Sequence, residues 1–75
     1  NDPFTVEDQV AIIFAGSKNL LKKVPVDKIK EFERKYIDFL NLKHKKTMET
    51  IKSGKLTDDV IAVLTKTAEE LSSTY

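Results

Sequence analysis

The catalytic chemistry open to this chain is limited by its single histidine, His44, and by the absence of cysteine. No spacing in the sequence suggests a Ser-His-Asp or Cys-His set. His44 lacks a second histidine or cysteine as a metal-binding partner, so we interpret it as a helix-packing residue. Gly16 is followed by SKNLLKK rather than by the GxxxxGK[ST] pattern that cradles phosphates. We therefore predict no catalytic, cofactor-binding or metal-binding residue.

Two groups of carboxylates have positions that could serve acid–base chemistry or metal binding. Glu33 lies on the apolar side of an expected helix, where an unpaired carboxylate is costly to desolvate. No second carboxylate or histidine is placed to work with it, so we predict a structural, buried and hydrogen-bonded acid. Asp58 and Asp59 follow Thr57, and adjacent acids at a helix start are more typical of capping than of a metal site.

Lysines gather in two parts of the sequence. One group forms a basic tip, consisting of Lys18, Lys22, Lys23 and Lys28. The other, from Lys43 to Lys55, could contact phosphates, but Glu49 shares its helical face and no aromatic residues are interleaved to stack on bases. We interpret it as a solvated face. The net charge of +1 is too balanced for a dedicated nucleic-acid surface, so a small nucleic-acid-binding helical domain is the weaker alternative.

The elements that must position these residues are organised around the stretch from Pro25 to Gly54. On a helix, one stripe of this stretch is mainly apolar and the charged residues point away from it. The stripe comprises Ile29, Phe32, Tyr36, Leu40, Thr47 and Ile51. The pattern predicts a helix over residues 25–53. Lys43 and His44 interrupt the stripe, so the pattern allows a bend or break within residues 41–46.

Two further helices can cover that stripe, one over residues 6–15 and one over residues 58–72. Thr5 and Thr57 are suitable N-caps, and the acids in both first turns match the helix dipole. A short helix is expected over residues 18–23. We predict an all-α fold, a small antiparallel helical bundle of three main helices plus a short connecting helix.

The helix expected over residues 6–15 lacks the polar back of a surface helix. Ile12 lies almost opposite Val10 and Phe14, so we expect the helix to be covered on both sides. Seventy-five residues make only one small domain, which suggests a missing neighbour. The chain begins without methionine, and we expect residues 1–75 to be a single domain of a longer chain. No apolar run approaches the roughly 20 residues that span a bilayer, and no signal peptide is evident.

An ordered series of motifs runs along the chain. It begins with EDQVAIIFAG at residues 7–16 and continues with Pro25…Lys28-Ile29…Phe32-Glu33, then His44…Ile51, and then Gly54-Lys55-Leu56. This series resembles the C-terminal helical domain of the F-type ATP synthase alpha subunit, and residues 7–16 resemble the segment that opens that domain. It covers nearly the whole chain, although residues 71–75 match nothing in the pattern.

The resemblance implies a non-catalytic structural or regulatory part of the catalytic hexamer. Such a domain packs below the nucleotide-binding domain and faces the rotating central stalk during proton-driven ATP synthesis. Its partners would be the upstream nucleotide-binding domain, the beta subunits and the central-stalk subunits, with no nucleic acid and no direct membrane insertion. ATP or ADP and Mg²⁺ would belong to the parent chain. The piece itself would not be an enzyme, whereas the parent complex would be a proton-transporting two-sector ATPase.

The resemblance also assigns roles to residues. The stalk-side interface would consist of Lys18, Lys22, Lys23 and Lys28. Ile12 and Phe14 would dock on the upstream domain. The complex would be peripheral at the cytoplasmic face of the cell membrane, with a bacterial plasma membrane favoured over an organellar inner membrane. The alternative is a free-standing helical protein-interaction module whose similarity to the family is coincidental.

Overall fold

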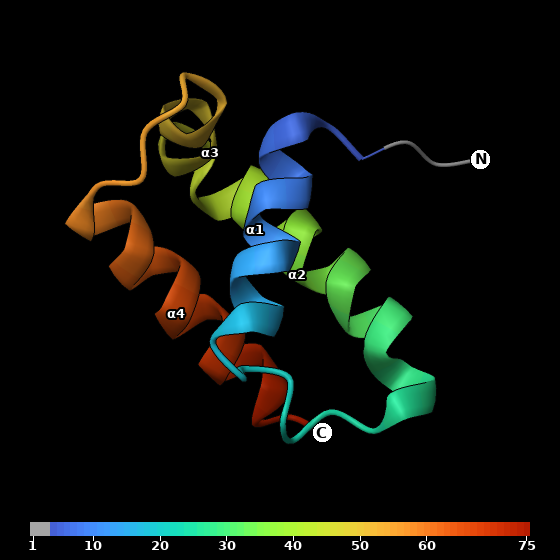
Figure 1. The fold of residues 1–75 in the computed structure, drawn as a ribbon. Coiled ribbons are helices and arrows are strands. Elements are labelled where there is room, and N and C mark those ends of the chain that lie inside the picture. The colour runs from blue at the N-terminus through green and yellow to red at the C-terminus, as the bar shows by residue number, and fades with distance from the viewer. Residues whose placement is uncertain (1–3) are drawn as a thin grey trace.

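Helices account for the regular structure in the computed structural model, which describes residues 4–75 (Figure 1). In chain order the elements are α1 (Val6–Ser17), the 3₁₀ turn η1 (Val26–Lys28), α2 (Ile29–Lys43), α3 (Lys45–Lys52) and α4 (Asp58–Ser72). The three long helices, α1, α2 and α4, alternate in direction along the chain (Figure 1). The predicted all-α class and bundle are confirmed, and no strand occurs within residues 4–75.

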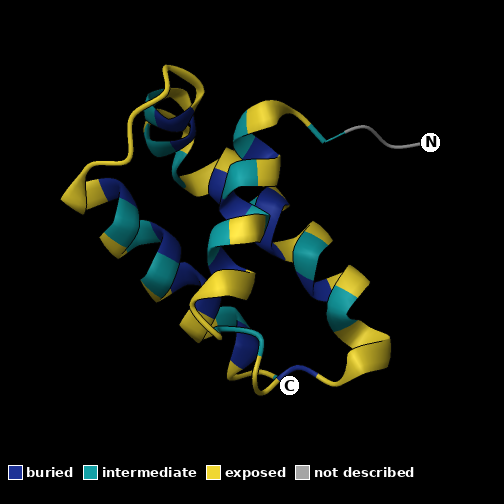
Figure 2. Ribbon diagram, in the orientation of Figure 1, coloured by how far each residue is buried: buried dark blue, intermediate teal, exposed yellow. Residues whose placement is uncertain are grey.

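The core lies where the four α-helices face one another, as the buried positions in Figure 2 show. On α2 the buried residues Phe32, Tyr36 and Leu40 follow the predicted helical stripe. The Tyr36 ring stacks on Phe32 with 5.7 Å between ring centroids, and its hydroxyl donates a 3.0 Å hydrogen bond to the carbonyl of Leu64 in α4. Burial raises the pKa of Tyr36 far above its usual value, so the hydroxyl stays protonated and keeps donating.

The long helix predicted over residues 25–53 is divided at His44. This residue leaves the helical conformation, with φ −130° and ψ 48°. Its N–H still donates to the carbonyl of Leu40, and its carbonyl accepts from the N–H of Met48. Only one residue therefore interrupts the helix, inside the interval where a bend was allowed. The change of direction lets α3 pack against α1, with Met48 and Ile51 buried.

The short helix predicted over residues 18–23 is wrong, because this stretch is a series of turns. The cause is Asn19, whose φ of 63° lies in the left-handed region. Its amide donates 3.1 Å to the carbonyl of Gly16, and the next amide, that of Leu20, donates 3.0 Å to the carbonyl of Ala15. These two bonds form the Schellman arrangement that ends a helix. Asn19 is therefore the residue whose conformation ends α1.

The start of α1 has a complete capping box formed by Thr5 and Asp8. The Thr5 hydroxyl accepts from the Asp8 N–H, and the Asp8 carboxylate accepts from the Thr5 N–H, both at 3.3 Å. Asp8 is only 7% exposed, and its second carboxylate oxygen accepts a 3.2 Å bond from Nδ2 of Asn41. Asp8 is thus a buried acid that links the start of α1 to the last turns of α2.

Replacing Asp8 with alanine is expected to lower the free energy of unfolding by about 2 kcal/mol. Loss of a helix cap costs roughly 0.5–2 kcal/mol, and the lost bond from Asn41 adds about 1 kcal/mol. Urea denaturation would measure the change, with the exposed acid variant Asp38→Ala as a control that should stay within about 0.5 kcal/mol of the parent. A double-mutant cycle with Asn41→Ala should show coupling, and strictly additive effects would contradict the link.

Candidate interaction surfaces

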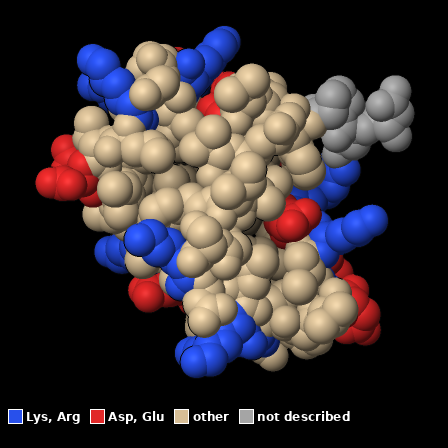
Figure 3. All heavy atoms as spheres, viewed as in Figure 1, with Lys and Arg blue, Asp and Glu red and all other residues tan. Residues whose placement is uncertain are grey.

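The basic tip lies at one end of the bundle, in the connector between α1 and α2 and in η1. Its members, Lys18, Lys22, Lys23 and Lys28, are all exposed. The Lys18 ammonium lies 5.9 Å from the centroid of the Phe14 ring. Lys22 and Lys23 line a shallow groove of about 350 Å³ together with Glu69 of α4. Figure 3 shows basic side chains gathered at the lower edge, over this connector. The connector and η1, which carry the four lysines, therefore lie at the same end of the bundle (Figure 1).

The side of α1 that faces the core is centred on two small residues rather than on its large apolar side chains. Ala11 and Ala15 are 0% and 1% exposed, and their small side chains let α1 lie close to the other helices. Ile12 and Phe14, the residues expected to dock on an upstream domain, are partly buried and pack against this same core. Both flank the buried alanines, so part of their apolar surface is already covered within the bundle.

The outer face of α1 carries two of the large apolar residues that the bundle leaves exposed; Val26, Leu42 and Leu56, on other elements, are exposed as well. Val6 and Ile13 are 70% and 67% exposed. They are seven residues apart, which places them on one side of the helix. In Figure 3 the charged side chains lie mainly around the rim of this view, while the centre, over α1, is largely uncharged. The uncovered side of α1 is therefore suited to contact with another protein surface.

Glu33 is not the buried acid that its neighbours in sequence predict. Its exposure is intermediate, and it lines an open pocket together with Phe4, Lys30 and Arg34. Phe32 points into the core, and the next position is rotated by about 100° around the helix, towards the rim. The Glu33 carboxylate therefore reaches the surface, in a pocket that also contains two basic side chains.

His44 takes part in helix packing at the break between α2 and α3. Its ring meets Phe39 edge to face, with 5.7 Å between centroids and 65° between the ring planes. In the part of the chain that the structure describes, no group of three or more histidine, cysteine or acidic residues could hold a metal ion. None of the helices described here is long and apolar enough to cross a membrane.

The sequence of this bundle matches a known family. Residues 1–71 match the family described as ATP synthase alpha/beta chain, C terminal domain. The chain belongs to this family. It is 63% identical over its full length to the ATP synthase subunit alpha of Christiangramia forsetii, and 57% identical to that of Flavobacterium johnsoniae. The protein of the same name from Parabacteroides distasonis is 39% identical over 92% of the chain.

The chain spans about one seventh of these relatives, or 14% of the length of the first two and 13% of the third. No solved structure matches it. The match to the ATP synthase alpha/beta C-terminal domain confirms the family that the sequence motifs indicated. The family match covers the bundle itself, and the greater part of each relative lies outside it.

The motifs that carried the resemblance have different physical roles in this ATP synthase domain. Phe32 is fully buried in the core. Gly54 has a φ of 93°, and its amide donates 2.9 Å to the carbonyl of Ile51, so it ends α3 in a conformation that favours glycine. Gly16 lies within α1, and a Cβ added there would meet nothing within 4 Å. The backbone of the ATP synthase domain therefore requires glycine at only one of these two motif positions.

Two packing features of this ATP synthase domain were not predicted from the sequence. The first is the inner face of α1, where the spacing of Asp8, Ala11 and Ala15 at i, i+3 and i+7 is the signal that could have revealed it. The second is Tyr75, which follows α4 and contacts α2. Its partners are at least forty positions away in the sequence, so no local pattern points to them.

Proposed function

We propose that this chain is a non-catalytic brace and lever within an ATP synthase alpha subunit. The observation that carries the proposal is the family match over residues 1–71 in a chain that covers 14% of its first relatives. ATP or ADP and Mg²⁺ would bind in the nucleotide-binding part of the parent chain. The parent complex would be a proton-transporting ATP synthase, peripheral at the cytoplasmic face of a bacterial plasma membrane.

The outer face of α1 is the surface that we propose docks on the upstream domain of the same chain. Val6 and Ile13 supply its exposed apolar centre, and the partly buried Ile12 and Phe14 lie beside it. Burying apolar surface yields about 25 cal/mol per Å², so two branched side chains offer a real gain once a partner covers them. The scarcity of charge over α1 in Figure 3 supports the same role.

The basic tip is the surface that we propose faces the central stalk, with beta subunits on either side. Exposed lysines contribute little to stability, so their concentration on one end is better explained by contact with an acidic surface. Electrostatic complementarity of this kind sets orientation and association rate more than affinity. The tip would then guide how the bundle meets the stalk as the ring changes shape.

The docking proposal is tested by Ile13→Asp in the full-length alpha subunit, co-expressed with the remaining subunits of the catalytic ring. The variant should fold, because Ile13 is exposed, but it should reduce the yield of assembled ring at least tenfold, because a charge would be buried at the docking surface. Size-exclusion chromatography and ATP hydrolysis by the isolated ring would measure the loss. Leu42→Asp is the matched control, since Leu42 is 78% exposed on α2.

Assembly of the Ile13→Asp ring at the level of the Leu42→Asp ring would refute docking through α1. Equal and severe loss with both variants would also contradict the proposal, because the bundle would then have no preferred docking face on α1. Charge reversal of Lys22 and Lys23 tests the tip separately. It should weaken the ring–stalk complex about twofold to tenfold at low salt, with a smaller effect at high salt.

A further inference from the structure

The residues after the last full turn of α4 form an ordered extension of that helix. The hydroxyls of Ser72, Ser73 and Thr74 each donate to the carbonyl three residues earlier, at 3.1, 2.7 and 2.7 Å. The carbonyls of Glu69 and Leu71 also accept the backbone N–H groups of Ser73 and Thr74, so the hydroxyls add a second set of bonds at this end of the helix. The Tyr75 N–H adds a 3.1 Å bond to the carbonyl of Ser72. The polar tail therefore fixes the direction in which Tyr75 leaves α4.

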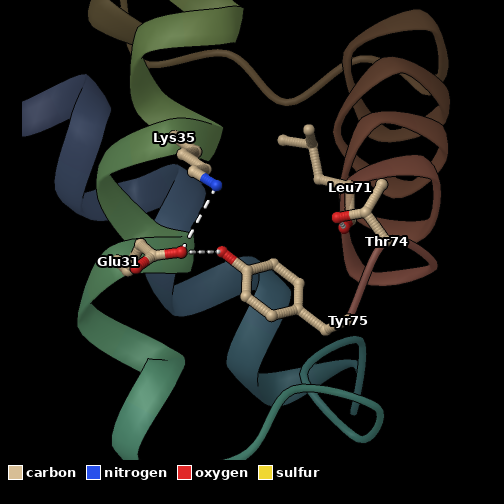
Figure 4. A network of polar contacts seen from close by, with 5 residues as sticks. All are labelled: Glu31, Lys35, Leu71, Thr74 and Tyr75. Atoms are coloured by element: carbon tan, nitrogen blue, oxygen red, sulfur yellow. Dashed lines mark hydrogen bonds and ion pairs between the residues drawn. The ribbon is translucent and has the colours of Figure 1, made fainter.

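Tyr75 reaches across to α2, beside Glu31 and Lys35 (Figure 4), and makes three kinds of contact there. Its hydroxyl donates a 3.0 Å hydrogen bond to Oε2 of Glu31, and its ring lies edge to face with buried Phe32 at 6.1 Å between centroids. The ammonium of Lys35 lies 5.6 Å from the ring centroid and 3.3 Å from the same Glu31 oxygen. The hydrogen bonds from Tyr75 and Lys35 lower the pKa of Glu31, which keeps this carboxylate charged and accepting.

The contact joins three segments at the end of the bundle that carries the basic tip. Figure 1 shows the C-terminal residues beside the connector that follows α1. Glu69 and Ser72, in the last turn of α4, line one groove with Asn19 and Lys22 of that connector. The last turn of α4 therefore lies between the start of α2, where Tyr75 binds, and the connector.

We propose that Tyr75 is a positioning residue, a reversible clasp that holds the last turn of α4 against α2 and thereby fixes the connector with its basic tip. Glu31 and Lys35 are about half exposed, and contacts between such groups are individually weak. The clasp can therefore open without unfolding the core around Leu64. Opening it would release the last turn of α4 and the connector together, as one local unit of low stability.

Hydrogen–deuterium exchange on the chain tests the clasp without any partner. Tyr75→Ala should raise the exchange rates of the hydrogen-bonded Leu20 and Val24 amides in the connector about threefold to tenfold, along with the last turn of α4. The amides of α3 should be unchanged. Tyr75→Phe, which keeps the ring against Phe32, should restore most of the protection.

Two outcomes would overturn the proposal. One is faster exchange confined to α4, which would mean that Tyr75 orders only its own tail. The other is an equal increase in every helix, which would mean general destabilisation. Glu31→Gln keeps the side-chain shape but removes the charge that Tyr75 and Lys35 share, and it should reproduce part of the Tyr75→Ala effect in the same segments. Leu56→Ala is the control, because Leu56 is half exposed in the α3–α4 loop. In the Leu56→Ala variant, the exchange rates of the connector amides should equal those of the parent.

Discussion

Replacing Phe32 with alanine is expected to lower the free energy of unfolding by about 3–5 kcal/mol, the usual cost of truncating a fully buried aromatic side chain. Phe32 is 0% exposed and packs against the rings of Tyr36 and Tyr75. The truncation therefore removes buried apolar area and leaves a cavity on the face where α2 meets α4. Small domains have only about 5–15 kcal/mol of stability, so most of the folded population should be lost well below the parent's denaturation midpoint.

Urea denaturation followed by far-ultraviolet circular dichroism would measure this change, with the midpoint and slope fitted together. Val26→Ala is the matched control, because Val26 is also apolar but is 87% exposed in η1. That control should differ from the parent by less than about 0.5 kcal/mol. A Phe32→Ala variant that lost under 1.5 kcal/mol would show that α2 does not place this ring at the centre of the core.

The parts of the fold that follow from local rules were predictable from the sequence. The stripe on α2 repeats with helical period, so its buried positions at Phe32, Tyr36 and Leu40 were foreseen. Thr57 caps α4 by accepting from the Val60 N–H at 3.3 Å, as its place before two acids indicates. Gly54 ends α3 with a positive φ, a conformation that glycine adopts more readily than other residues, so the residue type itself indicates the helix end.

The misses arose where several residue types could satisfy the same local rule, or where the partner is distant. Asparagine can adopt a left-handed conformation but is usually found in others, so its presence at position 19 does not by itself predict a helix end. The spacing of Leu20 and Leu21 therefore suggested a short helix. Glu33 was expected to be the buried acid, whereas the buried acid is Asp8. A carboxylate at the edge of an apolar stripe can turn outward, whereas one inside a capping box is held by two backbone bonds.

The sequence predicted where the two candidate surfaces lie, but only some of the residues that form them. Lysines are almost always exposed, so the exposure of the basic tip could be predicted from the lysines in the connector alone. The apolar face of α1 was harder, because a helix with apolar residues all round does not reveal which of them the core will take. The core took the side with Ala11 and Ala15, where small residues allow close packing, and left Ile13 outside.

Enlarging Ala15 to leucine is therefore expected to destabilise the fold by about 1–3 kcal/mol, since added methylenes in a packed core force neighbours out of their preferred positions. Ala15 is 1% exposed on the inner face of α1, which packs against α2, α3 and α4. Leucine is a good helix former, so any loss must come from packing rather than from helix propensity. Thermal and urea denaturation would both report it.

The neighbouring position supplies a control of opposite sign. Gly16→Ala adds a carbon that meets nothing within 4 Å, at a helical position that no longer needs glycine, so it should stabilise the chain by roughly 0.5–1 kcal/mol. Opposite effects at Ala15 and Gly16 would show that α1 turns its alanine side inward. Stabilisation by Ala15→Leu would mean the reverse, because a helix with its alanines facing solvent has room for the larger side chain. Ile13 would then lie in the core, and the apolar face assigned to docking would not exist.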